Sequence, residues 1–361
     1  MIVHKDVHYQ ISFSGNPESE IAVVTFDPMF VFQGDKAAGF GRAFLEAAGL
    51  AVYCVSRTSE CFYQMFDPAP VAADIERRGF GRVFTYGSSV GAHAALYFSK
   101  ELDASAIAFS PRLPLHPTAR DKYRAYDHVE MLHPVRFEER ISSHQHLIAY
   151  DPFDETDQRF VDATLSHLPR EQFVKAWFFG HPVIEPLVRI GLGKSIVLDF
   201  IRRGARPGPE FRRRKGESNR YLFNVSRMAE RHGHASVALA LIERAIGNGL
   251  DEPGVRLHLS KLLSKLGRKE EAVAALEGRE LDVTERAALA KAYASLGRLD
   301  RALELVSRNL EMSSAAFLFR DQADFLQRSG RTSDALAAVE RGLALHPGHR
   351  ELTNRKQRWS A

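Results

Sequence analysis

The stretch GSSVG at residues 87–91 constrains the fold of this chain more than any other part of it. An apolar, strand-like run at 82–86 precedes it, and an apolar, helix-like run at 92–98 follows it. This context predicts a sharp strand–turn–helix junction, in which the central residue is strained and its neighbours must be small. The two glycines meet that need, and Ser89 is left with its hydroxyl exposed above the end of the strand.

Strand-like and helix-like runs alternate along the first two hundred residues, which predicts a doubly wound, mainly parallel sheet of the α/β class. The expected strands are 21–26, 51–55, 82–86, 104–110, 146–150 and 174–179, with an antiparallel edge strand at 11–13. The expected helices are 39–48, 71–78 and 92–102, followed by one long closing helix at 185–203.

The segment 111–143 interrupts this alternation and is rich in charge and proline. Long irregular segments in compact domains are often functional, so a lid above the sheet is one interpretation. A surface excursion is the other, and the sequence favours neither. Basic side chains in this segment make an acidic substrate conceivable, although exposed charge usually serves only solvation.

Residues 219–361 change character, because strand signals almost vanish and a repeat appears. A glycine is followed five residues later by an alanine four times, and the glycines are spaced by 34, 30 and 33 residues. This period is typical of paired-helix repeats, in which the glycine ends the first helix and the alanine lets two helices approach closely. The sequence therefore predicts a C-terminal all-α domain. The four pairs are Gly233/Ala238, Gly267/Ala272, Gly297/Ala302 and Gly330/Ala335.

We expect a first domain at 1–204, a basic linker at 205–218 and the repeats at 219–361. A cluster of basic side chains lies where the first domain meets the linker. Its members are Arg202, Arg203, Arg206, Arg212, Arg213, Arg214 and Lys215. They are explained by an anionic partner, such as a membrane surface, or by a solvated linker. We favour the linker and expect no nucleic-acid partner, because Phe211 is the one aromatic residue there and a nucleic-acid platform would interleave several.

Composition is that of an ordinary globular protein, with 361 residues, 45% apolar content and a formal net charge of +4. Two cysteines, Cys54 and Cys61, argue against a disulfide scaffold and for a reducing compartment. The N-terminus lacks the pattern of a secretory signal, and no apolar run is long enough for a transmembrane helix. We therefore expect a cytoplasmic protein.

A serine nucleophile needs a base, and the base needs a third group to orient it. In one large class of serine enzymes the acid and then the histidine follow the serine along the chain. Asp154, in the turn after the strand at 146–150, is the expected acid, and Asp151 is the alternative. Asp157 is most simply the cap of the next helix, at 158–167, although the sequence leaves the choice among the three acids open.

His181 follows the last expected strand and a glycine, and is the expected base. A backbone N–H at Val90, at the start of a helix, is the first expected oxyanion donor. The second is expected after the strand at 21–26, where Pro28 has no N–H, so Met29 or Phe30 remains. No metal-ligand spacing, phosphate loop or dinucleotide signature occurs, so no metal and no cofactor are expected.

The run YGSSVGAHAAL at 86–96, with the acid turn near Asp154 and the loop histidine His181, resembles the α/β-hydrolase superfamily over about residues 20–203. The segments at 62–64 and 109–112 are similar to bacterial hydrolases associated with surface-glycan genes. Typical members have a second glycine after the motif, where this chain has Ala92. The repeats resemble tetratricopeptide repeats over roughly 220–349, more closely in the third and fourth copies.

The superfamily resemblance implies a serine hydrolase, most simply an esterase or deacylase, that forms an acyl-enzyme on Ser89. The expected substrate is an acyl ester of a small molecule or a glycan, and the repeats would bind a protein partner. An O-acyltransferase acting on a glycan is a close variant, in which exclusion of water by the lid decides the outcome. A non-catalytic interaction scaffold on a degenerate hydrolase fold is the second hypothesis, and a peptidase is a third.

Overall fold

The computed structural model describes residues 1–29, 39–133 and 137–359, and the chain forms two compact units, Met1–Tyr221 and Leu222–Ala361. The segment at 205–218 belongs to the first unit and is not a free linker. It contains helix α7 (Pro209–Arg214), whose Phe211 ring packs 5.6 Å from the Phe179 ring. The unit boundary therefore lies a few residues later than the sequence suggests, because an aromatic contact holds this segment on the first unit.

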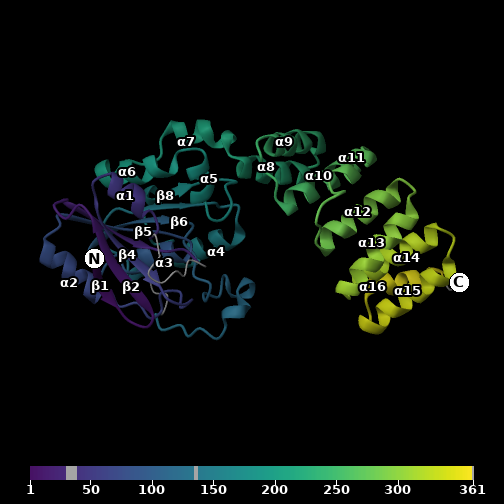
Figure 1. Cartoon of the computed structure of the whole chain (residues 1–361), viewed down its shortest axis with the longest axis horizontal. Helices are drawn as coiled ribbons and strands as arrows, with labels where there is room; N and C mark the ends of the chain where they lie inside the picture. The colour runs from purple at the N-terminus through teal and green to yellow at the C-terminus, as the bar shows by residue number, and fades with distance from the viewer. Residues whose placement is uncertain (30–38, 134–136, 360–361) are drawn as a thin grey trace. The chain divides into compact units, whose positions relative to one another are not determined.

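The first unit is built on an eight-stranded sheet with the order β1-β2-β4-β3-β5-β6-β7-β8 (Figure 1). The strands β1 and β2 pair antiparallel, β2 pairs antiparallel with β4, and the remaining neighbours pair parallel. The strand expected at 11–13 lies in β2. It is not the edge strand, because β1 pairs with its outer side. The strand bounds are Ile2–Lys5, Tyr9–Gly15, Ile21–Phe26, Ala51–Arg57, Arg82–Ser88, Ala104–Phe109, Leu147–Tyr150 and Phe173–Lys175.

Helices cover both faces of this sheet (Figure 1). One face packs against α1 (Arg42–Ala47), α5 (Ile184–Arg189) and α6 (Gly193–Arg203). Against the other face pack α2 (Ala69–Arg78), α3 (Val90–Tyr97) and α4 (Glu155–Thr164). Neighbouring strand residues alternate between the two cores, which is why the inner strands read as continuous apolar runs. The expected mixed α/β layer structure is confirmed.

Several expected elements are shorter in the structure, and for two of them the physical reason is clear. The closing helix is divided into α5 and α6 at Gly191, whose φ of 75° ends the first helix. The last strand, β8, stops at Lys175 and not at Phe179. The reason is that the backbone N–H groups of Phe178 and Gly180 turn to the Asp151 carboxylate and leave the sheet.

The segment at 111–143 forms short 3₁₀ turns at Arg120–Lys122, Arg124–Tyr126 and Phe137–Glu139. Leu113 and Phe137 are buried in the core that also holds α3 and α4. The described part of this segment is therefore anchored to the domain by apolar contacts and is not a loose excursion. Its expected role as a lid stays a prediction.

In the described residues of the second unit, every regular element is a helix, as the sequence predicts. The four repeat glycines adopt φ values of 84°, 80°, 75° and 78°, and an added Cβ would meet nothing within 4 Å at any of them. The left-handed backbone, and not crowding, therefore requires glycine. The four paired alanines are 0% exposed between helices. The helices are α8 to α16, at Asn219–Arg231, Ala235–Gly247, Pro253–Lys265, Lys269–Ala274, Val283–Ser295, Leu299–Met312, Ala316–Arg328, Thr332–Leu345 and Arg350–Trp359.

Candidate active site

Ser89 occupies the sharp turn between β5 and α3, with φ 56° and ψ −120°. Such a conformation is strained for a residue that carries a side chain. A Cβ on Gly87 would lie 2.2 Å from the carbonyl carbon of Gly91, and a Cβ on Gly91 would lie 2.3 Å from the carbonyl oxygen of Phe26. The turn therefore requires both glycines, as the sequence predicts.

Three side chains from distant parts of the chain meet at this turn. The Ser89 Oγ lies 2.9 Å from Nε2 of His181, and Nδ1 of His181 lies 3.0 and 3.1 Å from the two carboxylate oxygens of Asp157. The Asp157 side chain is fully buried, and the His181 side chain is 16% exposed. This is the hydrogen-bonding order of nucleophile, base and orienting acid.

The structure exchanges the roles expected of Asp154 and Asp157. Helix α4 begins at Glu155, so Asp154 is its N-cap and accepts hydrogen bonds of 3.0 Å from the N–H groups of Thr156 and Asp157. Asp157 lies within the first turn, where its side chain reaches His181. Asp151, Asp154 and Asp157 are each three residues apart, so the spacing of an acid from the next acid does not by itself locate the helix start.

Asp151, the alternative acid, holds the loop that carries His181. Its buried carboxylate accepts hydrogen bonds from the N–H groups of Phe153 (2.9 Å), Phe178 (3.0 Å) and Gly180 (2.7 Å). Burial raises the pKa of Asp151, and these donors partly offset that effect. Asp151 therefore acts on His181 through the backbone and is a positioning residue.

Arg112, which was not expected at this site from the sequence, lies beside both acids. Its Nε and Nη2 donate to one oxygen of Asp157 at 3.0 and 2.7 Å, and Nη2 also donates to Asp154 at 2.6 Å. Burial alone would raise the pKa of Asp154, but Arg112 and the N–H of Asp157 outweigh it, so the pKa is lowered. Arg112 follows the carboxyl end of β6, next to β5 and β7. A basic residue just after this strand could therefore have been predicted to lie near Ser89 and the acids.

The expected oxyanion donors lie at the ends of neighbouring strands. Val90 is the buried first residue of α3, and Met29 follows β3. The turn before Met29 is held in place, because Arg57 donates to the carbonyl of Pro28 (2.6 Å) and the Tyr63 hydroxyl donates to the carbonyl of Asp27 (2.8 Å). The donor roles of Val90 and Met29 stay predictions, and Phe30 lies outside the described residues.

Comparison with known proteins identifies the second unit. Residues 196–353 match the tetratricopeptide repeat family, a match that begins within α6. The C-terminal region is therefore a tetratricopeptide repeat region, a class of module that mediates interactions between proteins. The expected resemblance of the repeats is confirmed. The expected relationship of the first unit to hydrolases receives no support from the comparisons.

Several solved repeat proteins match part of the chain. YrrB, described as a TPR protein with an unusual peptide-binding site, is 17% identical, with 48% of this chain and 89% of YrrB covered and a TM-score of 0.38. The MamA protein is 14% identical, with 40% of this chain and 81% of MamA covered and a TM-score of 0.36. A tetratricopeptide repeat protein from Parabacteroides merdae is 16% identical, with 40% of this chain and 59% of that protein covered and a TM-score of 0.36. No curated protein sequence matches the chain significantly. Within the described residues, no helix is both long and apolar enough to cross a membrane.

Proposed function

We propose that the first unit is a serine hydrolase of the α/β-hydrolase type. The observation that carries this proposal is the continuous hydrogen-bonded chain from Ser89 through His181 to Asp157. Two further features support it. The nucleophile lies in a strained turn between a strand and a helix, and the three groups follow one another along the chain as serine, acid and histidine.

The geometry suits attack on an acyl ester. Ser89 Oγ would attack the carbonyl carbon while Nε2 of His181 takes the hydroxyl proton, and Asp157 would hold the resulting imidazolium. The carbonyl oxygen would gain negative charge beside the N–H groups of Val90 and Met29. Collapse of this intermediate would break the ester bond, and His181 would return the proton to the departing alcohol.

The acyl group would then leave Ser89 by a second attack. With water as acceptor the product is a carboxylic acid, which makes the enzyme an esterase or deacylase. With a sugar hydroxyl as acceptor the same residues would carry out O-acyl transfer to a glycan. Exclusion of water from the acyl-enzyme decides between the two outcomes, and the segment at 111–143, which supplies Arg112, is the part of the chain that we assign to this task.

We assign recruitment of a protein partner to the repeat region. Repeat arrays present extended surfaces and commonly bind other chains. The hydrolase would thereby be held where its acyl ester substrate is found. Cys54 and Cys61 are both buried and free, in agreement with the reducing, cytoplasmic location that we propose.

A non-catalytic scaffold is the second candidate, and the comparisons favour it at least as well. The family match lies on the repeats and not on the sheet of the first unit. Arg112 also donates to the same Asp157 oxygen that His181 contacts, which partly neutralises that carboxylate. In this case the first unit would be a structural support for the repeats.

Labelling by a fluorophosphonate probe separates these candidates, because only an activated serine reacts with it. We expect the full chain to be labelled and Ser89→Ala and His181→Ala to remain unlabelled. Ser88→Ala is a matched control, because the Ser88 hydroxyl is buried without a hydrogen-bond partner and its loss should leave labelling unchanged. A folded wild-type chain that resists the probe would contradict the hydrolase proposal and favour the scaffold.

A further inference from the structure

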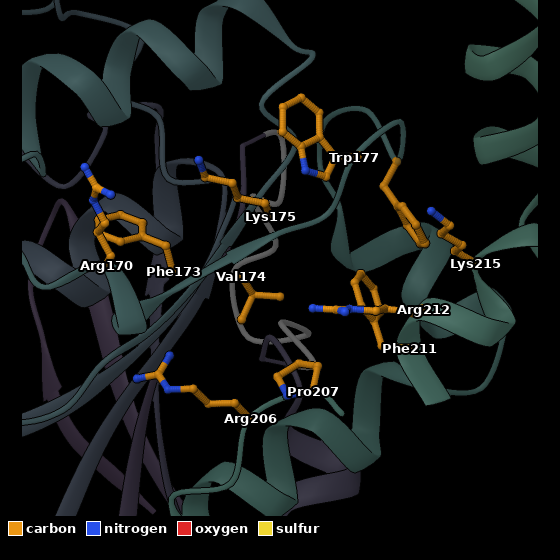
Figure 2. A pocket seen from close by; sticks show the side chains of 11 residues that line it. Arg170, Phe173, Val174, Lys175, Trp177, Arg206, Pro207, Phe211, Arg212 and Lys215 are labelled. Carbon is orange, nitrogen blue, oxygen red and sulfur yellow. The ribbon is translucent and has the colours of Figure 1, made fainter. Parts of the chain in front are cut away.

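A cavity of about 550 Å³ lies beside β8, the last strand in the sheet order. Its walls come from β8 with the turn before it and the loop after it, and from residues 206–215, which run from the segment after α6 to the turn after α7 (Figure 2). All of these residues belong to the first unit. Ser89, His181 and Asp157 do not line the cavity, so it is a site separate from the proposed catalytic one.

The charge that lines this cavity is positive. Figure 2 shows cations on opposite sides of the cavity, and the Arg212 guanidinium extends toward Val174. No carboxylate lines the cavity, and within the described part of the chain none of these cations forms an ion pair with an acid. By contrast, Arg203 and Arg214 of the same basic stretch pair with acids on their own helices or turns. The cavity cations are Arg170, Lys175, Arg206, Arg212 and Lys215.

The guanidinium group of Arg206 has incomplete hydrogen bonding. Its Nη2 donates to the carbonyl of His146 at 2.9 Å, but its Nη1 is buried without a hydrogen-bond partner. Burial lowers the pKa of Arg206, although Glu171 acts in the opposite direction at longer range. A buried charged donor without an acceptor is unfavourable, and native proteins rarely leave one unexplained.

Aromatic side chains form the rest of the wall. Trp177 is 45% exposed, which is unusual for so large an apolar group, and the buried Phe179 ring packs against Phe211. An indole and guanidinium groups around one hollow suit a ligand that has a flat apolar part beside its charge. Small-molecule sites in proteins commonly have volumes of roughly 300–1,000 Å³, a range that includes this cavity.

We propose that this cavity binds a soluble small molecule that carries a dianionic phosphoester group next to an apolar ring. The phosphoester oxygens contact Arg212, and the ring packs against Trp177. A small ligand is favoured over an extended polyanion because the cations surround one hollow from several sides and do not form a track. This proposal replaces the solvated-linker interpretation for Arg206, Arg212 and Lys215, and it is independent of the proposed hydrolase activity.

Tryptophan fluorescence provides a direct test in the full chain. The chain has two tryptophans, so Trp359→Phe leaves Trp177 as the reporter. We expect phenyl phosphate to produce a saturable change at constant ionic strength. Inorganic pyrophosphate, which has the charge without the ring, and phenol, which has the ring without the charge, should each bind more weakly.

A matched pair of substitutions makes the test specific. Arg212→Gln and Arg213→Gln remove the same charge from adjacent positions of α7, but Arg213 does not line the cavity. Arg212→Gln should weaken phenyl phosphate binding about tenfold, the value of one charged hydrogen bond, and Arg213→Gln should change it less than about twofold. Lys175→Gln provides a second cavity variant if Arg212→Gln folds poorly.

Two results would overturn the proposal. The first is equal weakening in Arg212→Gln and Arg213→Gln, or no saturable binding at all, because either outcome leaves only nonspecific attraction by the basic segment. The second is binding of heparin or of phosphatidylglycerol vesicles without binding of phenyl phosphate, because the ligand would then be a polyanion or a membrane surface.

Discussion

At the scale of single residues, the candidate site depends on which acid reaches His181. Asp154 and Asp157 are three residues apart and both contact Arg112, yet only Asp157 contacts the histidine. Asp154 instead satisfies the first N–H groups of α4. Two chemically identical side chains on one turn therefore have different roles, because the helix start directs them to different partners.

Replacement of each acid by its amide tests this division. If the first unit is a serine hydrolase, Asp157→Asn should reduce ester turnover by a factor of about 10³–10⁴, since an amide favours the wrong histidine tautomer. Asp154→Asn should reduce turnover only a few-fold, because asparagine also caps helices well. Rates are measured with a chromogenic acyl ester, and circular dichroism checks the fold. A larger loss in Asp154→Asn than in Asp157→Asn would contradict the assignment.

At the scale of elements, the chain uses glycine for two different physical reasons. In the turn around Ser89 the glycines are needed because other backbone atoms lie within van der Waals distance. In the repeats the space is open, and glycine is needed for its left-handed backbone at the end of a helix. The first requirement is steric and the second is conformational, and a substitution experiment can separate conformation from space.

Gly330 and Gly247 form a matched pair for that experiment, since an added Cβ meets nothing within 4 Å at either position. Gly330 follows α14 with φ 78°, whereas Gly247 is the last residue of α9 and has helical backbone. Gly330→Ala should lower the free energy of unfolding by about 1–2 kcal/mol. Gly247→Ala should raise it by about 0.5–1 kcal/mol. Urea unfolding followed by circular dichroism measures both, and shifts of the same sign would contradict the conformational explanation.

At the scale of the whole molecule, the two units are stabilised by separate cores. The first unit buries histidines in its core as neutral rings. His146 accepts a hydrogen bond from the Ala106 N–H at Nδ1 (2.9 Å) and contacts the carbonyl of Ser142 through Nε2 (3.1 Å), so both ring nitrogens are occupied in the neutral form. His93 is enclosed by aromatic rings that include Phe137 and Phe160.

Burial lowers the pKa of His146 to about 4 and that of His93 to about 3, from an ordinary value of 6.5. Above about pH 6.5 both folded and unfolded chains hold these rings neutral, and their stabilising effect is complete. As the pH falls from 6.5 toward 4, the unfolded chain takes up protons that the folded chain does not. The free energy of unfolding should then fall by about 1.4 kcal/mol per pH unit for each histidine.

Urea unfolding between pH 7 and pH 4.5, followed by Trp177 fluorescence in the Trp359→Phe background, measures this slope for the first unit. His93→Leu should reduce the slope by about 1.4 kcal/mol per pH unit, because one buried titrating group is removed. His167→Gln is the matched control, since His167 is exposed and its replacement should leave the slope unchanged. An unchanged slope in His93→Leu would show that acid unfolding has another origin.

Local chain chemistry determined much of this protein. The turn at Ser89, the alternation of the first unit and the four Gly–Ala pairs of the repeats can each be predicted from neighbouring residues, because turns, caps and amphipathic periods involve residues that are close in sequence. The place of His181 in a loop after the last strand can be predicted in the same way. Tertiary structure decided the rest. The choice of Asp157, the place of Arg112 beside it and the gathering of Arg170 with Arg212 around one cavity depend on strands and loops that meet only when the sheet forms.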